Sequence, residues 1–331
     1  MAVYRTVSYL ICQVLNNIII GALMDRENNL QKIRSLRGCV TALITPFDNK
    51  HEVDYEGLKK NIRFQIENGV TGIVPLGTTG ESPTITEHEF KDIVSTSIEV
   101  AHNKIPVIVG TGSNSTEKTV LTTKKAEELG ADAALIMTPY YNKPTQEGIY
   151  RHFEKISSST KLPIIIYNIA SRTGVNIETK TMVRLSNLKN IVGVKEASGN
   201  INQITEIINQ LPDNFVVMSG DDSMTLPLIS LGGHGVISVA SNIIPRMTSD
   251  MVKLALEGKI SEARKLNKYI MPIFRDLFIE TNPIPIKTAM YMLGMPSGSF
   301  RLPLCDMTPQ NKEKLRATLS SYEEFKEYIK M

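Results

Sequence analysis

The sequence predicts an α/β protein, and within that class a (β/α)8 TIM barrel with a C-terminal helical extension. Eight short apolar runs occur along the chain, and segments with helical periodicity separate them. Eight strand-like runs, each followed by a helix-like segment, are the expected pattern of such a barrel. A doubly wound parallel sheet stays open as the alternative, because strand order cannot be read from one sequence.

The strand-like runs begin just after Gly38. The expected strands are Val40–Ile44, Gly72–Pro75, Pro106–Val109, Ala133–Met137, Pro163–Tyr167, Ile191–Lys195, Phe215–Ser219 and Gly235–Val239. The expected helices are Tyr55–Asn68, Glu87–His102, Glu117–Leu129, Gln146–Ser158, Thr179–Leu188, Ile201–Leu211, Ser223–Leu231 and, closing the barrel, Pro245–Gly258. Cap residues support these limits: the glycines that follow helical segments are Gly69, Gly130 and Gly232, and a capping-box pair is formed by Thr86 and Glu89.

The chain of 331 residues divides into three expected regions. Residues 38–258 form the barrel, and residues 259–331 continue with helical segments and no strand. Residues 1–37 form an N-terminal extension of unknown role. Its apolar stretch is interrupted by Gln13, Asn16 and Asn17, so it is too polar for a membrane span and is also a poor secretory signal. We therefore expect no membrane association.

Composition argues against several classes of protein. The formal net charge of +3, without a basic run containing aromatics, argues against a nucleic-acid partner. The three scattered cysteines, Cys12, Cys39 and Cys305, indicate a reducing compartment, which we take to be the cytoplasm. The five histidines lack the spacing of metal ligands, so we expect no metal site.

Lys195 ends one of the apolar runs, Ile191–Lys195. A strand's last residue lies where the sheet opens to solvent, so the amine there is partly desolvated. Desolvation disfavours the ammonium form and lowers the pKa of a lysine, which makes the amine a nucleophile toward carbonyls. The alternative for this residue alone is a solvated lysine at a strand end.

In a barrel of this kind, catalytic groups lie at the carboxyl ends of the strands and in the loops that follow. Those positions hold the segments Gly77-Thr78-Thr79-Gly80-Glu81, Thr138-Pro139-Tyr140-Tyr141-Asn142, Tyr167-Asn168, Ser171-Arg172-Thr173-Gly174, Lys195-Glu196, Ser219-Gly220-Asp221-Asp222 and Ile237-Ser238. These groups suit a keto acid bound by a lysine. Glycines let backbone N–H groups around Thr78 and Thr79 approach a carboxylate, tyrosines move protons, and Arg172 can hold a second carboxylate.

Each feature also has a plain structural interpretation that stays open at this point. The Gly77–Gly80 segment is a common kind of tight turn, and it lacks the Gly-Lys-Ser/Thr ending of a nucleotide-binding loop. Tyr140 and Tyr141 can pack at an interface, and Tyr167 can lie in the core. We expect Asp221 and Asp222 to cap the next helix rather than to bind a metal.

With these residues in place, the chain resembles the dihydrodipicolinate synthase family, within the larger N-acetylneuraminate lyase superfamily. The resemblance covers residues 38–322 and rests on the segments Thr45-Pro46-Phe47, Gly77-Thr78-Thr79-Gly80-Glu81-Ser82, Pro139-Tyr140-Tyr141-Asn142-Lys143-Pro144, Tyr167-Asn168, Ser171-Arg172-Thr173-Gly174, Gly193-Val194-Lys195-Glu196, Ser219-Gly220-Asp221-Asp222 and Asn282-Pro283-Ile284-Pro285. It implies a Schiff-base-forming lyase of the class I aldolase type. It also implies no metal or organic cofactor, because the lysine itself is the electron sink.

The resemblance assigns a role to each matching residue. The implied catalytic residues are Lys195, which forms the Schiff base with pyruvate, Tyr167, which donates and accepts the proton, and Thr78 and Tyr141, which complete a proton relay. The implied binding residues are Thr79 and the backbone of Ile237 for the pyruvate carboxylate, and Arg172 for the carboxylate of L-aspartate 4-semialdehyde. In the family the second tyrosine comes from a neighbouring subunit, so the resemblance implies a dimer, and the usual state is a homotetramer built as a dimer of dimers.

The implied reaction condenses pyruvate with L-aspartate 4-semialdehyde to give 4-hydroxy-tetrahydrodipicolinate, in the diaminopimelate route to lysine. Two alternatives stay open. The first is a pyruvate-dependent aldolase or lyase that acts on a keto-deoxy sugar acid or on sialic acid, and the second is a non-catalytic barrel that binds a keto acid. Arg172 favours the synthase, since sialic-acid lyases resemble this chain but lack an arginine there.

We expect weak or absent feedback inhibition by lysine. Lysine-inhibited members of the family bind lysine in a groove at the dimer interface, and the matching positions here include Ser82, Asn114 and Tyr140. Glu87 and Phe90 stand where sensitive bacterial enzymes have histidines, and Lys118 stands where they have glutamate. A cationic Lys118 repels the amino group of the ligand.

Overall fold

The chain folds into a barrel of eight parallel strands. The structure is a computed structural model that describes residues 27, 29–102 and 104–329. The strands are β1 (Gly38–Ala42), β2 (Gly72–Val74), β3 (Ile108–Gly110), β4 (Ala133–Met137), β5 (Ile164–Asn168), β6 (Ile191–Glu196), β7 (Val216–Ser219) and β8 (Gly235–Ser238). Their order in the sheet is β2-β1-β8-β7-β6-β5-β4-β3, and a parallel bridge from Ile73 to Val107 joins the two edges. The predicted (β/α)8 barrel is therefore confirmed, and the doubly wound alternative is excluded.

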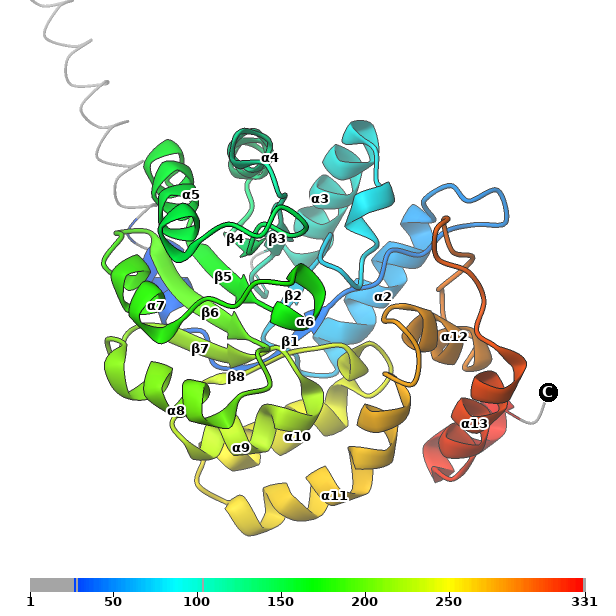
Figure 1. Cartoon of the computed structure of the whole chain (residues 1–331). Coiled ribbons are helices and arrows are strands. Elements are labelled where there is room, and N and C mark those ends of the chain that lie inside the picture. The colour runs from blue at the N-terminus through cyan, green and yellow to red at the C-terminus, as the bar shows by residue number, and fades with distance from the viewer. Residues whose placement is uncertain (1–26, 28, 103, 330–331) are drawn as a thin grey trace, which may run out of the picture.

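Helices alternate with the strands and cover the outside of the barrel (Figure 1). They are α2 (Tyr55–Glu67), α3 (Glu87–Ala101), α4 (Thr116–Glu128), α5 (Gln146–Ser159), α6 (Ala170–Thr173), α7 (Thr179–Ser186), α8 (Ile201–Gln210), α9 (Thr225–Ser230) and α10 (Pro245–Leu256). The C-terminal helices are α11 (Ile260–Asp276), α12 (Ile284–Met292), α13 (Pro309–Ser320) and α14 (Lys326–Ile329). Short 3-10 turns are η1 (Ser82–Thr84), η2 (Asp222–Met224), η3 (Ala240–Asn242) and η4 (Glu323–Phe325). Helix α11 packs against α10, and α12 packs against α13.

Residue periodicity explains why these segments form strands and helices. In α5 the buried positions Ile149, Phe153 and Ile156 recur at helical spacing, so one face of the helix covers the sheet. In β5 the residues alternate: Ile164 packs with the cluster that lies under the helices, whereas Ile165 packs with the cluster that contains alternate residues of the other strands. Both faces of the strands are thereby buried, as the continuous apolar runs predict.

The predicted strands and helices are confirmed, with ends displaced by up to two residues. The run predicted as Val40–Ile44 forms β1 from Gly38 to Ala42, because the residues that pair with β2 and β8 are Gly38 to Ala42; Leu43 and Ile44 are buried beyond the last paired residue. The predicted caps are also confirmed. Gly69, Gly130 and Gly232 adopt positive φ values after their helices, and Thr86 with Glu89 forms the capping box of α3. The segment carrying Arg172, expected as a loop, instead forms the single helical turn α6, which ends at Gly174 (φ 74°).

Part of the N-terminal extension packs against the barrel. Residues 29–34 are helical, and Leu30, Ile33 and Leu36 are buried within the same hydrophobic cluster as the strands. The Lys32 ammonium donates to Asp132 at 2.6 Å. The interrupted apolar stretch around Gln13, and Cys12, lie outside the described residues. No helix in the described part of the chain is both long and apolar enough to cross a membrane.

Candidate active site

The carboxyl ends of the strands surround a cavity. Its polar lining consists of Thr78, Thr79, Tyr167, Arg172, Lys195 and Asn282. All of these except Asn282 are residues that the sequence predicts for the site. They come from the turn after β2, from the ends of β5 and β6, from α6 and from the connection between α11 and α12. The fold therefore brings together side chains that are far apart along the chain.

Lys195 lies near the end of β6 and is only 5% exposed. Gly220 leaves room for its stem, because a Cβ atom there would lie 3.1 Å from both Cγ and Cε of Lys195. Burial lowers the pKa of the Lys195 ammonium from its ordinary value of 10.5 to about 8, although the Asp222 carboxylate raises it. More of this amine is therefore neutral and nucleophilic near neutral pH than is usual for a lysine.

Tyr167 is the partner of Lys195 across the β5–β6 pair. The Lys195 Nζ atom lies 4.3 Å from the centre of the Tyr167 ring. Burial raises the pKa of the Tyr167 phenol above its usual range, so the hydroxyl keeps its proton. The next pair in register is Asn168 and Glu196, and the Asn168 amide donates to Glu196 Oε2 at 3.1 Å. This hydrogen bond ties the two strand ends together behind the lysine and the tyrosine.

The two aspartates after β7 differ in their contacts. Asp221 accepts a hydrogen bond from the Ser223 N–H at 2.8 Å and caps η2, as predicted. The prediction that Asp222 caps the same helix is wrong. Its buried carboxylate accepts from the Val239 and Ala240 N–H groups at 3.1 and 3.0 Å, because a buried carboxylate needs donors and these follow β8. Burial raises the pKa of Asp222 to about 6.

The described residues hold no group of three His, Cys, Asp or Glu side chains that could bind a metal ion.

The turn after β2 presents Thr78 and Thr79 to the cavity. Thr79 is 3% exposed, and its hydroxyl oxygen accepts a hydrogen bond from the Asn282 amide at 3.0 Å. Arg172 is exposed, and its guanidinium donates to the backbone carbonyl of Asn282 at 2.9 Å. Asn282 therefore connects the two predicted binding residues through its side chain and its backbone.

Sequence reasoning missed this role of Asn282. The segment Asn282–Pro285 contributed to the family resemblance, but no function was assigned to its asparagine. Its partners Arg172 and Thr79 lie 110 and 203 residues away in the chain. Asn282 directly follows the polar residues Glu280 and Thr281, so no local pattern singled it out or identified partners so distant.

Two predicted site residues do not belong to the lining of the cavity. Tyr141 is 88% exposed and has a φ of 72°, a left-handed conformation that is rare for residues other than glycine. Ile237 lies within β8 and is fully buried, whereas Val239, the residue directly after this strand, lines the cavity. The roles of Tyr141 and of the Ile237 backbone stay predictions.

The positions that differ from lysine-sensitive relatives lie near the starts of α3 and α4. Glu87 forms an ion pair with Lys125 at 2.5 Å, and Lys118 is exposed. Lys118 and Lys125 thus bring two ammonium groups to or beside these positions, and like charge disfavours the binding of a lysine amino group there. Weak inhibition by lysine stays a prediction.

A (β/α)8 barrel with a buried lysine at a strand end suits a Schiff-base-forming lyase. The profile of the dihydrodipicolinate synthetase family matches residues 35–322. A 4-hydroxy-tetrahydrodipicolinate synthase from Protochlamydia amoebophila is 51% identical over 288 residues, covering 86% of this chain and 96% of the relative. The crystal structure of dihydrodipicolinate synthase from Aquifex aeolicus has a TM-score of 0.85 at 49% identity, covering 87% of this chain and 98% of that chain.

A structure of a monomeric dihydrodipicolinate synthase variant is also similar, with a TM-score of 0.85 at 44% identity, covering 86% of this chain and 96% of that chain. The chain belongs to the dihydrodipicolinate synthetase family. It is an enzyme, a Schiff-base-forming lyase, and its predicted function as a 4-hydroxy-tetrahydrodipicolinate synthase is confirmed. The sugar-acid or sialic-acid lyase and the non-catalytic barrel are not favoured by these similarities.

Proposed function

We propose that this chain condenses pyruvate with L-aspartate 4-semialdehyde through a Schiff base on Lys195. One observation carries the proposal: a lysine that is 5% exposed, with its pKa lowered to about 8, lines the same cavity as Arg172. An amine for one substrate and a guanidinium for the carboxylate of another are thereby available in a single site.

The first chemical step uses the neutral form of Lys195. The amine attacks the keto carbon of pyruvate to give a carbinolamine, and loss of water gives the Schiff base. Removal of a methyl proton then gives an enamine. Tyr167 suits these proton transfers, since its phenol keeps its proton and its ring lies 4.3 Å from the lysine nitrogen. Thr78, which also lines the cavity, passes the proton onward in this scheme.

Thr79 binds the carboxylate of pyruvate in this proposal. Its hydroxyl oxygen already accepts a hydrogen bond from the Asn282 amide, so its own hydrogen is left to donate to a carboxylate oxygen. The glycines on either side of the two threonines allow a close approach to the backbone N–H groups. The backbone of Ile237 completes this subsite on the side of β8.

Arg172 binds the carboxylate of the semialdehyde. Arg172 is exposed, and one N–H of its guanidinium donates to the Asn282 carbonyl. The other N–H groups of the guanidinium can therefore make a two-point contact with a carboxylate. The enamine carbon attacks the aldehyde carbon and forms the new carbon–carbon bond. The amino group of the semialdehyde then attacks the imine carbon, which closes the ring and releases Lys195 as a free amine.

Tyr141 acts in the site of a neighbouring subunit. Its 88% exposure and its left-handed backbone suit a side chain that projects away from its own chain. The enzyme then needs at least a dimer, and we propose a cytoplasmic homotetramer built as a dimer of dimers. Light scattering of the purified protein tests the assembly.

A condensation assay tests the proposed function. Purified enzyme is supplied with pyruvate and, separately, with L-aspartate 4-semialdehyde, sugar-derived aldehydes or sialic acid. We expect rapid turnover only with the semialdehyde. Faster cleavage of sialic acid, or faster condensation with a sugar aldehyde, would contradict the proposal, and no turnover with any substrate would favour a binding protein.

A further inference from the structure

A second buried lysine, Lys287, lies close to the site but does not line the cavity. It belongs to α12 and is 1% exposed. Its ammonium donates to Glu81 Oε1 at 2.6 Å and to the Ser299 carbonyl at 2.7 Å, and it lies 4.4 Å from the centre of the Phe47 ring. The charge is therefore paired and two of the three ammonium donors are engaged, so we assign Lys287 no role as a second nucleophile.

The partner of Lys287 is the last residue of the turn that carries Thr78 and Thr79. Glu81 is 2% exposed and adopts a φ of 54°, in the left-handed region that disfavours side chains larger than hydrogen. Its backbone N–H donates to the Thr78 carbonyl at 3.1 Å, which closes the turn. A strained conformation of this kind persists only where surrounding contacts determine it. The carboxylate of Glu81 supplies such contacts.

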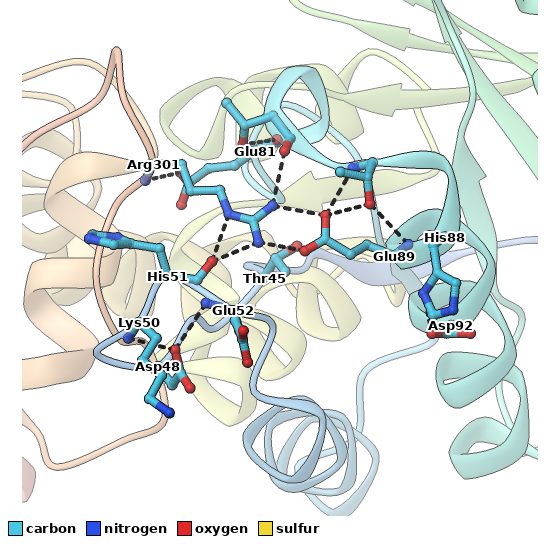
Figure 2. Close-up of polar contacts among 12 residues, drawn as sticks. Thr45, Asp48, Lys50, His51, Glu52, Glu81, His88, Glu89, Asp92 and Arg301 are labelled. Atoms are coloured by element: carbon cyan, nitrogen blue, oxygen red, sulfur yellow. Dashed lines mark hydrogen bonds and ion pairs between the residues drawn. The ribbon is translucent and has the colours of Figure 1, made fainter.

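Glu81 is held by the C-terminal segment from two sides. One carboxylate oxygen accepts from the Lys287 ammonium, and the other accepts from the Arg301 backbone N–H at 3.3 Å. Figure 2 shows the Arg301 guanidinium between Glu89 and the backbone of His51. The guanidinium donates to Glu89 Oε1 at 2.5 Å and to the His51 carbonyl at 2.7 Å. Arg301 is thus fixed to the loop after β1 and to the start of α3, so its backbone is a rigid support for Glu81.

The connection that precedes α12 holds the same turn at a second point. The Asn282 amide donates to the Thr79 hydroxyl oxygen at 3.0 Å. Lys287, in the α12 helix that follows, pairs with Glu81. The turn is therefore attached on one side of Gly80 to the connection before α12 and on the other side to α12 itself. The barrel contributes a further contact to the turn, from the Thr45 hydroxyl to the Gly80 carbonyl at 2.7 Å.

We propose that Lys287 is a positioning residue for the reaction: through Glu81 it holds Thr78 and Thr79 in the geometry that receives pyruvate. The inference rests on the proposed function, in which Thr79 binds the pyruvate carboxylate. It gives the C-terminal helices a direct part in the site. Small displacements of a binding group from its productive position reduce rates strongly, so a local loss of this ion pair should be visible in catalysis.

The test compares Lys287→Met and Glu81→Gln with a matched control, Asp276→Asn. Asp276 is also a fully buried carboxylate, paired with Arg275 at 2.7 Å at the end of α11, and it does not line the cavity. Each variant is assayed for melting temperature, for the KM of pyruvate, and for the rate of borohydride trapping of pyruvate on Lys195. We expect Lys287→Met to raise the KM for pyruvate by roughly tenfold or more and to slow trapping at low pyruvate to a similar extent. Asp276→Asn should lower the melting temperature while the KM stays unchanged.

Glu81→Gln keeps the shape of the side chain and decides the question if Lys287→Met does not fold. If both folded variants bind and trap pyruvate as the wild type does, the ion pair is only structural and the inference is wrong. Thr79→Val separates this failure from that of the proposed function. Impairment of Thr79→Val beside a normal Lys287→Met would overturn only the inference, whereas a normal Thr79→Val would overturn the proposed role of Thr79 and the inference together.

Discussion

The Lys195 ammonium nitrogen lies 4.3 Å from the centre of the Tyr167 ring, and the two residues are partners in register between β5 and β6. Backbone pairing of two parallel strands therefore sets the relative position of the amine and the phenol before any ligand binds. Burial acts on both groups in the direction that catalysis needs, since it lowers the pKa of the amine and raises the pKa of the phenol. One feature of the fold thus prepares both groups for the roles proposed for them, Lys195 as nucleophile and Tyr167 as proton donor.

The rate of Schiff-base formation should rise with pH through a midpoint near 8. Only the neutral amine attacks pyruvate, and burial lowers the pKa of Lys195 to about 8. The negative charge of Asp222 raises that pKa, so Asp222→Asn should move the midpoint to lower pH. The initial rate of borohydride trapping, measured across pH, reports the midpoint.

Asp221→Asn is the matched control for this shift, because it makes the same chemical change at the cap of η2 and should leave the midpoint in place. A midpoint near the ordinary lysine value of 10.5 in the wild type would contradict the account of Lys195.

Arg172→Ala should impair use of the semialdehyde far more than capture of pyruvate. Loss of a charge-assisted contact to a carboxylate costs about 1.5–3 kcal/mol, so we expect the KM for the semialdehyde to rise by roughly 10- to 100-fold. Steady-state kinetics with each substrate, together with pyruvate trapping, measures both effects. Arg172→Lys keeps the charge without the two-point geometry and should be intermediate. Equal losses in semialdehyde use and in trapping would show that Arg172 has a different role.

Two inactive variants should restore activity when mixed, if Tyr141 acts across a subunit interface. Tyr141→Phe lacks the relay hydroxyl and Lys195→Ala lacks the nucleophile. A dimer that contains one chain of each kind has one site with an intact Lys195 and with Tyr141 supplied by the other chain. After unfolding and refolding of an equal mixture, about a quarter of the wild-type activity is expected from random pairing. No recovery in mixed dimers, with each parent inactive, would contradict the shared site.

Sequence periodicity predicted the order and type of the barrel elements, because strands and helices depend on local patterns of buried residues. It also predicted Lys195, Arg172 and Thr79 at the site, since barrel topology places strand ends together. It did not predict the buried pair of Lys287 and Glu81, whose residues lie 206 positions apart and carry no local signal. Asp222 was misassigned for a related reason: its partners, Val239 and Ala240, follow the next strand, β8, and do not belong to the helical turn that Asp222 begins.

Ile33→Ala should destabilise the fold without changing the chemistry of the site. Ile33 is fully buried against the barrel in the N-terminal helical segment, and loss of its side chain leaves a cavity. We expect the free energy of unfolding to fall by about 2–4 kcal/mol, while the KM for pyruvate stays at the wild-type value at low temperature. The exposed neighbour Gln31 supplies the control, since Gln31→Ala should change stability by less than about 0.5 kcal/mol. Equal stability of the two variants would show that this segment is dispensable for the fold.

The most direct test of the account is the mass of the protein after treatment with pyruvate and borohydride. We predict that the wild type gains one reduced pyruvyl group per chain and that peptide mapping locates it on Lys195. Lys195→Ala should gain none, although Lys287 and the other lysines are intact. A modified Lys195→Ala protein, or a wild type that carries the group on another lysine, would contradict the assignment of Lys195 as the nucleophile.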